Sequence, residues 1–430
     1  MAKADVFLPT GMRDLLPAQM RARHWVIDTV RGVFARYGFD PLETPALERI
    51  ETLMGKYGDE GDKLIFKVLK RGEGGKAGEV DSALRYDLTV PLARVVAMNP
   101  GLALPFKRYQ IEPVWRADRP QKGRFRQFHQ CDVDIVGSES PLCEAECLAV
   151  VHDALKALGF TDFTIRLNDR RILRAMAAAI GAEDREGAML TAIDKLDKIG
   201  RDGVTAELRE RGFSEAQAEG LFAMLEGRAP VPGGEAAEAG LGEIRQMAEA
   251  LGVAPGHIAL DRTLARGLDY YTGPVYETVV TKPAIGSISG GGRYDRLVGM
   301  FSGKDIPAVG VSLGLERILT VMEELGMLPD VSAAVDVYVT VWDDATRPAA
   351  LAAAAAFRAA GLRTELHLGG GKPGKQLQAA ERRGARFAAI VGPEEAAAGA
   401  VQLKTLASRA QQTLPLAMAV IRAKSERTEP

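Results

Sequence analysis

The sequence predicts an α+β protein: a mostly antiparallel sheet flanked by helices, with an inserted helical domain and a C-terminal α/β domain. Three strand-like runs, RGLDYYTGPVYETVV, SISGGGRYDRLVGM and AVGVSLGLERILTVMEEL, follow one another with few crossovers, which is typical of antiparallel sheets. Residues 174–256 are instead rich in Ala, Glu and Leu and have a helical period. We therefore place a sheet-based domain at 1–328, interrupted by 174–256, then a linker at 329–334 and an α/β domain at 335–430.

The predicted elements of the first domain follow from hydrophobic period and turn residues. Gly38 ends the first helix, and Pro91 is tolerated in the first turn of the second. In chain order we expect a helix at 19–37, a strand at 64–70, a flexible Gly-rich loop at 71–80, a strand running into a helix at 83–99, a hairpin of strands at 107–115 and 125–136, a helix at 140–159 and a strand at 163–168.

The last hundred residues alternate between strand and helix patterns, which indicates an α/β domain. The expected elements are strands at 335–342, 362–368 and 385–392, with helices at 348–360 and 375–383 between them.

Length and charge limit the function classes. The 430 residues are enough for two or three domains, and an apolar content of 47% with 26% charged residues is ordinary for a globular protein. The formal net charge is −2, so binding of a polyanion would need local basic patches.

The cysteines and the N-terminus bear on the compartment. Three cysteines, Cys131, Cys143 and Cys147, are too few for a disulfide framework and fit a reducing compartment. No further Cys or His lies at ligand spacing, so no metal site is expected. The N-terminus lacks the features of a signal peptide, and no apolar run reaches the ~18 residues of a membrane span. We expect a cytoplasmic protein with no membrane association.

The hairpin segment WRADRPQKGRFRQFHQCDVDIVG, residues 115–137, gathers cations and then reverses sign. Alternate residues of a strand share a face, so the apolar residues of its second strand lie on one face and the polar ones on the other. The polar face could bind a phosphate through its arginines, a flat ring on Phe128 and a nitrogenous group near Gln130 and Asp134. From the hairpin alone, a solvated face with surface ion pairs is an equally good interpretation. The polar set is Arg124, Arg126, Phe128, Gln130, Asp132 and Asp134.

Three further segments carry candidate binding residues. In RGLDYYTG, Arg266 precedes two tyrosines; adjacent tyrosines are most often core, but an arginine on an apolar strand must be paired. The glycines of GSISGGGRYDRLVG lack the order of a dinucleotide site, and no P-loop occurs, so we expect them to let backbone lie close to a ligand. In GLERIL, Arg317 lies at the start of an amphipathic helix. It is either a surface residue or a ligand of a phosphate group.

Together these segments resemble the class II aminoacyl-tRNA synthetases, which bind ATP without a P-loop on an antiparallel sheet, and within that class the histidyl-tRNA synthetase family. RADRPQKGRFRQFHQCDVDIVG is similar to the family's motif 2 and AVGVSLGLERI to its motif 3. RGLDYYTG and SGGGRYDRLV resemble its two histidine-specific motifs, and LPTGMRDLLP and YGFDPLETPALE its N-terminus and motif 1. GKQLQAAERRGARFAAIVG resembles its anticodon-binding domain, so the resemblance covers nearly all of the chain.

The resemblance implies roles at the ATP end. Arg116 would hold the α-phosphate and the substrate carboxylate, and Arg266 would neutralise charge at the α-phosphate during in-line attack. Phe128 would stack on the adenine, which Asp118 would help to place, although the class II pattern usually has Glu there. The triphosphate would be held by Arg124 and Arg317. The implied catalytic residues are Arg116, Arg266 and Arg317, and tRNA contacts are expected at the loop tip, at Arg119, Gln121 and Lys122.

At the other end of the site, the resemblance implies a pocket that reads the amino group and the imidazole of histidine. A site that hydrogen-bonds both ring nitrogens can reject other amino acids by ~10⁴-fold without editing. The implied histidine ligands are Asp87, Leu88, Thr89, Arg116, Gln130, Asp134, Arg266, Tyr270, Tyr271 and Tyr294.

The implied reaction joins histidine to ATP, giving histidyl-adenylate and pyrophosphate, and then transfers histidine to the 3′ end of histidine tRNA. ATP is a substrate, and Mg²⁺ is expected to bind through its phosphates. Motif 1 implies a homodimer. The segment RYDLTVP has Tyr-Asp where many bacterial members have Pro-Glu, and with QCDVDIVG it resembles the branch shared with eukaryotic and archaeal members; RPQKGR resembles bacterial members.

Two alternatives share the catalytic fold. A histidine-sensing regulatory subunit of ATP phosphoribosyltransferase typically lacks the anticodon-binding domain and the arginine of RGLDYY. A domain that only senses uncharged tRNA would have lost arginines of motifs 2 or 3. This chain keeps Arg116, Arg266 and Arg317. The basic residues of the C-terminal domain form either an RNA-binding patch or a solvated helix face: Arg363, Lys372, Lys375, Arg382, Arg383 and Arg386.

Overall fold

The computed structural model describes residues 6–265, 270–329, 334–369 and 371–426. The chain divides into two compact units. The first comprises Met1–Leu15 and Arg23–Met327, and the second Leu16–Ala22 and Leu328–Pro430. Within the described residues, no helix has the length and apolarity needed to span a bilayer.

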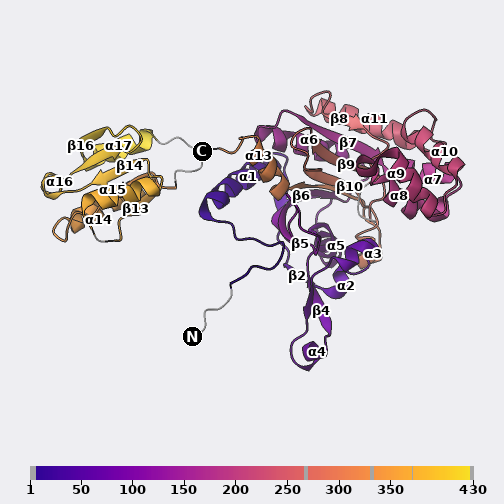
Figure 1. The fold of residues 1–430 in the computed structure, drawn as a ribbon, viewed down its shortest axis with the longest axis horizontal. Helices are drawn as coiled ribbons and strands as arrows, with labels where there is room; N and C mark the ends of the chain where they lie inside the picture. The colour runs from indigo at the N-terminus through magenta and orange to yellow at the C-terminus, as the bar shows by residue number, and fades with distance from the viewer. Residues whose placement is uncertain (1–5, 266–269, 330–333, 370, 427–430) are drawn as a thin grey trace. The chain divides into compact units, whose positions relative to one another are not determined.

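An eight-stranded sheet forms the centre of the first unit (Figure 1). Five of its neighbouring pairs are antiparallel, and only the pairs β1–β5 and β7–β8 at the two edges are parallel. The predicted fold class is therefore confirmed. The strands in spatial order are β1 (Asp40–Pro41), β5 (Phe106–Trp115), β6 (Gln127–Val136), β11 (Ala308–Gly314), β10 (Ser289–Arg293), β9 (Pro274–Val280), β7 (Phe163–Asp169) and β8 (Ile258–Leu260).

The predicted hairpin is the β5–β6 pair, and its register determines which of its side chains lie on the same face of the sheet. Asp134 of β6 lies opposite Arg108 of β5 and Gly310 of β11. Asp132 lies opposite Ser312 of β11. Paired residues in a sheet point to the same side, so these side chains share one face.

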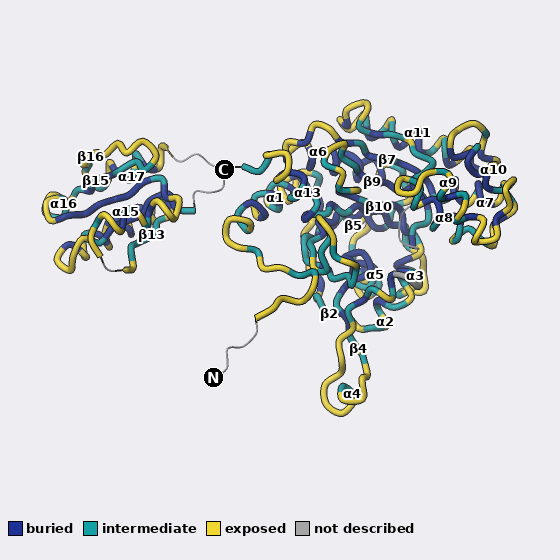
Figure 2. Tube along the Cα trace, viewed as in Figure 1, coloured by how far each residue is buried: buried dark blue, intermediate teal, exposed yellow. Residues whose placement is uncertain are grey.

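Helices cover the sheet and connect its strands. α6 (Leu142–Ala157) packs against β6, β10 and β11, and α13 (Leu315–Glu324) against β6 and β11. Figure 2 shows the strands β7, β9 and β10 as largely buried. The other described helices before residue 328 and outside the helical segment are α1 (Pro17–Arg36), α2 (Ile50–Leu53), α3 (Gly58–Lys63), α4 (Glu73–Lys76), α5 (Thr89–Met98) and α12 (Gly299–Ser302).

Between β7 and β8 the described chain is helical. The last of these helices, α11, packs against α6 and β7, which joins the segment to the sheet. The segment contains α7 (Arg170–Ala179), the 3₁₀ turn η1 (Glu183–Arg185), α8 (Glu186–Ile193), α9 (Leu196–Glu210), α10 (Glu215–Leu225) and α11 (Glu235–Ala250).

A small three-stranded sheet lies beside the main one. Its order is β2–β4–β3, with β2 (Leu47–Arg49), β3 (Lys67–Leu69) and β4 (Val80–Leu84). The predicted Gly-rich loop at 71–80 contains the short helix α4, which the loop interpretation missed, and β4 and α4 project from the unit (Figure 1). From β4 the chain turns directly into α5, as predicted.

The second unit is built on a five-stranded sheet of order β13–β12–β14–β15–β16. The three strands β13, β12 and β14 are parallel, and the remaining pairs are antiparallel. Its core contains Phe357 and Phe387, both fully buried. The elements are β12 (Val337–Val339), α14 (Arg347–Ala359), β13 (Thr364–Leu366), α15 (Pro373–Arg382), β14 (Phe387–Ile390), α16 (Pro393–Ala398), β15 (Ala400–Thr405), β16 (Gln411–Pro415) and α17 (Leu416–Ser425).

Candidate active site

A cavity of about 1170 Å³ opens over the polar face of the β5–β6 hairpin. Its walls come from the β4–α5 corner, from β9–β11, from the start of α13 and from the helical segment. Phe128, Gln130, Asp132 and Asp134 of this face line the cavity, which favours a binding face over a solvated one. Arg126 does not line the cavity, whereas Phe125, expected on the core face, does. The predicted site residues that line this cavity are Asp87, Thr89, Arg116, Asp118, Arg124, Phe128, Gln130, Asp134, Tyr270, Tyr271, Tyr294 and Arg317.

Four predicted residues in the described part of the chain are not among the lining residues. Leu88 has a fully buried side chain, and its carbonyl accepts a 3.1 Å hydrogen bond from Arg108, so it supports the wall from behind. The loop-tip residues Arg119, Gln121 and Lys122 do not line the cavity, and Lys122 pairs with Glu324 at 2.6 Å. The prediction for Arg266 falls outside the described residues.

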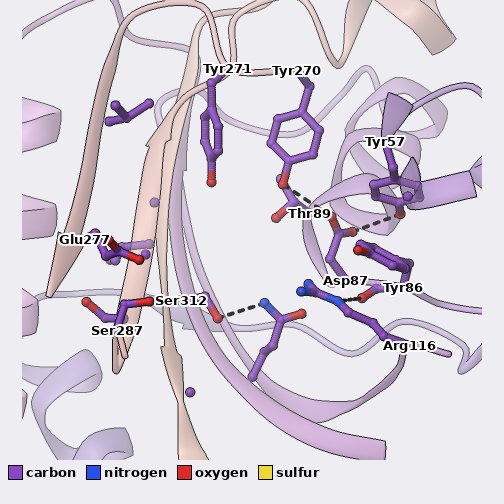
Figure 3. Close-up of a pocket in the computed structure, with 18 of the residues that line it drawn as sticks. Tyr57, Tyr86, Asp87, Thr89, Arg116, Tyr270, Tyr271, Glu277, Ser287 and Ser312 are labelled. Carbon is purple, nitrogen blue, oxygen red and sulfur yellow. Dashed lines mark hydrogen bonds between the residues drawn. The ribbon is translucent and has the colours of Figure 1, made fainter. Parts of the chain in front are cut away.

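Asp87 anchors one end of the cavity, at the turn from β4 into α5. Its Oδ1 accepts hydrogen bonds from the Tyr57 hydroxyl at 3.1 Å and the Val90 amide at 3.0 Å (Figure 3). Its Oδ2 accepts from the Tyr270 hydroxyl at 3.3 Å. Burial raises the pKa of the Asp87 carboxyl, although all three donors favour its charged form. A cation placed here would neutralise a costly buried charge.

Two further buried carboxylates, Asp132 and Asp134, lie on β6 and line the cavity. The Arg108 guanidinium, with no exposed surface, lies 2.7 Å from Asp134 and 4.0 Å from Asp132. The Tyr294 hydroxyl also donates to Asp134. Burial raises the pKa of both carboxyls, that of Asp132 to about 7, because one arginine cannot balance two desolvated carboxylates.

Gln130 lies on the same strand, next to these carboxylates. Its amide Nε2 donates to the Ser312 hydroxyl at 2.9 Å, which fixes the side chain. Its Oε1 is buried and has no hydrogen-bond partner among the described residues. Since an unpaired buried acceptor costs free energy, the geometry favours a ligand that brings a donor to this point.

A cationic and aromatic part of the cavity wall begins beside Asp87, at Arg116 (Figure 3). The Arg116 guanidinium carbon lies 4.2 Å from the centre of the Tyr86 ring and 5.2 Å from that of Phe128. Its Nε donates to the Tyr86 carbonyl at 3.0 Å. Arg317, from the first turn of α13, donates to the carbonyl of Ser287. Arg124 is less tightly held, with its Nε 3.8 Å from an Asp118 carboxylate oxygen.

Glycines make the part of the floor formed by β10 and β11. A Cβ at Gly310 would lie 1.9 Å from Asp134 Oδ1, and one at Gly291 would lie 2.2 Å from the Gly310 carbonyl. At Gly292 it would meet the Tyr271 ring at 2.9 Å. The glycines were expected to admit a ligand; Gly290 and Gly291 line the cavity, but Gly292 makes room for Tyr271.

Several lining residues were missed from the sequence. Tyr57 lies outside the quoted segments. Tyr86 lies in RYDLTVP, and Glu277 and Ser312 lie on predicted strands, but the sequence indicated no ligand role for any of the three. The strand parity that selected Phe128 and Gln130 also included Asp132, but no ligand role followed from it. Three basic lining residues come from the helical segment, where the helical period gave no hint of a site: Arg170, Lys195 and Arg211.

The described residues offer no group of three His, Cys, Asp or Glu side chains that could hold a metal ion. Cys131, Cys143 and Cys147 are free, buried thiols. A divalent ion that keeps most of its waters needs fewer protein ligands, and Glu277 supplies a cavity-facing carboxylate near Ser287 (Figure 3).

Comparison with known proteins decides the family. The family model described as "Histidyl-tRNA synthetase" matches residues 11–318, well over half of the chain. The chain belongs to the histidyl-tRNA synthetase family. The family model described as "Anticodon binding domain" matches residues 336–425, within the second unit.

Relatives and solved structures of this family cover nearly the whole chain. "Histidine--tRNA ligase" of Gloeobacter violaceus is 46% identical, over 95% of this chain and 96% of its own length. The protein of the same name from Aeropyrum pernix is 43% identical, over 96% of each. A crystal structure of histidyl-tRNA synthetase from Nostoc sp. PCC 7120 covers 99% of this chain and all of its own, with a TM-score of 0.83 and 33% identity.

One structural match bears on the regulatory alternative. A Bacillus halodurans structure titled "ATP phosphoribosyltransferase regulatory subunit/histidyl-tRNA synthetase" covers 91% of this chain with a TM-score of 0.75. At 23% identity it shows a shared fold alone. The histidyl-tRNA synthetase assignment rests on the matches above.

Proposed function

We propose that this chain is a histidine–tRNA ligase that activates L-histidine with ATP and transfers it to the 3′ end of histidine tRNA. The observation that carries the proposal is one cavity with buried carboxylates at one end and arginines with an aromatic ring at the other, in a member of the histidyl-tRNA synthetase family. The two ends suit a cationic amino acid and an anionic nucleotide.

In the histidine end, Asp87 and Thr89 bind the α-ammonium group, because Asp87 is a buried carboxylate whose charged form a cation would stabilise. Gln130 and Asp134 bind the imidazole nitrogens, and the unpaired Gln130 Oε1 accepts a ring N–H. The tyrosines Tyr270, Tyr271 and Tyr294 close the pocket around the ring.

In the nucleotide end, Phe128 stacks on the adenine and Asp118 helps to place it. Arg116, between its two aromatic rings, contacts the α-phosphate and the histidine carboxylate. Arg124 and Arg317 hold the β- and γ-phosphates, where the planar guanidinium gives paired contacts. Arg266 is proposed to contact the α-phosphate as well.

The chemistry then needs positioning and electrostatics more than proton transfer. A carboxylate oxygen of histidine attacks the α-phosphorus in line, and the bond to the bridging oxygen of pyrophosphate breaks. Arg116 and Arg266 stabilise the negative charge that develops on the α-phosphate oxygens. Mg²⁺ bound to the phosphates, with Glu277 as a carboxylate ligand, would neutralise charge on the leaving pyrophosphate. A ribose hydroxyl of the tRNA terminus then takes the histidyl group and AMP leaves.

The domain limits and partners complete the proposal. The catalytic domain spans 1–328 with the helical insertion at 174–256, and residues 335–430 bind the anticodon stem and loop after a linker at 329–334. Arg119, Gln121 and Lys122 at the hairpin tip contact the acceptor end of the tRNA. The enzyme acts in the cytoplasm as a homodimer; a monomeric mass in solution would contradict the dimer.

Histidine-dependent exchange between ATP and pyrophosphate tests the activation step. We expect exchange with histidine and none with other amino acids, because their side chains leave Gln130 and Asp134 unpaired. Arg266→Ala should lower the exchange rate by about 100-fold or more, since a charge-stabilising contact is lost. Absence of exchange in the wild type would refute the enzyme, whereas normal exchange by Arg266→Ala would refute the role of that residue alone.

A further inference from the structure

Two buried tyrosines, Tyr57 and Tyr86, contact two neighbouring charged groups of the cavity wall, Asp87 and Arg116. Tyr57 precedes α3 and Tyr86 follows β4, and only 4% and 5% of their surfaces are exposed. Both line the cavity, and their ring centres are 4.5 Å apart with a tilt of 42° between the rings. This is the range in which aromatic pairs attract each other.

Each tyrosine of the pair also holds one charged group of the site (Figure 3). The Tyr57 hydroxyl donates to Asp87, the carboxylate at the histidine end. Burial, followed by the charge of Asp87, raises the pKa of Tyr57 well above its ordinary value, so the hydroxyl keeps its proton and remains a donor.

Tyr86 holds the arginine at the nucleotide end in two ways. Its ring face lies 4.2 Å from the Arg116 guanidinium carbon, and its carbonyl accepts the Arg116 Nε–H at 3.0 Å. The hydrogen bond fixes the base of the guanidinium, and the ring fixes its plane through a cation–π contact. Any residue at position 86 could supply the carbonyl, but only an aromatic one supplies the ring.

We propose that Tyr57 and Tyr86 are positioning residues that keep Asp87 and Arg116 in a fixed relation, so that the histidine carboxylate is presented to the α-phosphate. The inference rests on the proposed function, because it assigns the two charged groups to the two substrates. It also gives a role to the Tyr-Asp of RYDLTVP, at which the sequence departs from the Pro-Glu of many bacterial members: proline at position 86 would supply the carbonyl without the ring.

The ring and the hydroxyl of each tyrosine are separable by substitution. Tyr86→Phe keeps the ring and should exchange pyrophosphate within about twofold of the wild type, whereas Tyr86→Leu should lower kcat/KM for ATP by about 10-fold, the size of a partly desolvated cation–π contact. Tyr57→Phe removes only the hydrogen bond to Asp87, so the KM for histidine should rise about 3- to 10-fold with the KM for ATP unchanged.

Tyr109→Leu is the matched control. Tyr109 also belongs to an aromatic pair, with its ring centre 5.9 Å from that of Phe34, but it does not line the cavity. It should lower the thermal unfolding temperature without changing either KM. This separates a loss of stability from a loss of positioning, because the Michaelis constants of Tyr86→Leu and Tyr57→Phe should change while their folded fractions at the assay temperature do not.

The outcomes separate the two levels of the proposal. Wild-type protein without exchange would remove the proposed function and this inference together. Wild-type exchange with an unchanged Tyr86→Leu, or with Tyr86→Phe impaired as much as Tyr86→Leu, would overturn the ring contact alone. An unchanged KM for histidine in Tyr57→Phe would likewise overturn the role of that hydroxyl.

Discussion

At the scale of single residues, three buried carboxylates dominate the charge of the cavity, and the neighbouring cation only partly balances them. Asp87, Asp132 and Asp134 are each about 2% exposed or less, and Arg108 is the buried cation among them. Burying a charge without a partner is costly, so these carboxylates favour a ligand that is cationic or donates hydrogen bonds. This explains the reversal of sign along the hairpin sequence.

Asp134→Asn should damage histidine binding and spare ATP. An amide replaces the carboxylate that Arg108 and Tyr294 hold, so a hydrogen bond to the imidazole is weakened in a dry site. We expect kcat/KM for histidine to fall by about 100-fold, with the KM for ATP within about threefold. Steady-state pyrophosphate exchange measures both. Glu146→Gln, which breaks a partly exposed pair with Lys107, is the control and should change neither constant; an equal loss for both substrates would contradict the assignment.

Asp132 gives a prediction for pH. Its pKa is raised to about 7 in the folded protein, so between about pH 4 and 7 the folded state holds a proton that the unfolded state has released. Stability from this group is therefore lost as the pH rises through 7. Asp132→Asn has no such titrating proton. Between pH 5 and 8 the wild type should therefore lose on the order of 2 kcal/mol of unfolding free energy relative to this variant.

Denaturant unfolding of the ligand-free protein across this pH range measures the difference. Asp81→Asn, at an exposed position of β4, should follow the wild type in parallel. A difference between Asp132→Asn and the wild type that stays constant with pH would show that Asp132 is charged throughout.

At the scale of elements, the site depends on strands that carry little side-chain bulk. In β10 and β11, glycines leave space that Asp134 and the tyrosines of neighbouring segments fill. In the antiparallel register Gly310 lies directly opposite Asp134, so the Asp134 carboxylate occupies the space that a side chain at position 310 would fill. The position of a buried carboxylate is thus set by the absence of a side chain on the next strand.

Gly310→Ala should therefore act on histidine rather than on the fold alone. The new methyl group would overlap Asp134 Oδ1, and the carboxylate would have to move. We expect a loss of stability of about 1–3 kcal/mol, as for overpacked cores, and a rise of at least about 10-fold in the KM for histidine. Gly240→Ala in α11 meets no atom within 4 Å and should be neutral or stabilising by about 1 kcal/mol. Thermal unfolding and exchange kinetics on both variants decide.

The elements also show what sequence can reveal. Strand alternation placed Phe128, Gln130 and Asp134 on one face because a hairpin imposes period two without help from the rest of the fold. Tyr57 and Tyr86 could not be found in this way. They meet through tertiary packing, from segments that are separate in the chain. A tyrosine in such a segment has the same local pattern whether it packs in a core or supports a site.

At the scale of the whole molecule, the activation site and the anticodon-binding domain belong to different units of the chain. All of the described residues that line the cavity lie before Met327, and the anticodon-binding match lies within 336–425. Each unit has its own sheet and core. The change from a mostly antiparallel to an alternating strand and helix pattern predicts a domain boundary at 329–334. All of the described residues that line the candidate site therefore belong to the first unit.

Truncation after residue 328 should separate the two half-reactions. We expect histidine-dependent pyrophosphate exchange to stay within about threefold of the full chain, while aminoacylation of tRNA falls by roughly 100-fold through lost phosphate and base contacts. In the full chain, aminoacylation should also weaken with added salt more steeply than exchange does. A truncated protein that is folded by circular dichroism yet inactive in exchange would place part of the activation site in the second unit.

The glycine floor has a consequence for inhibitor design. A compound that rests on Gly290 and reaches toward Asp134 touches positions where the cell has little freedom to mutate. Resistance commonly arises from a bulkier residue that blocks a drug, but at Gly310 or Gly291 the same bulk would strike Asp134 or a neighbouring strand. A resistance mutation at either of those two positions is therefore expected to weaken binding of the amino acid substrate as well.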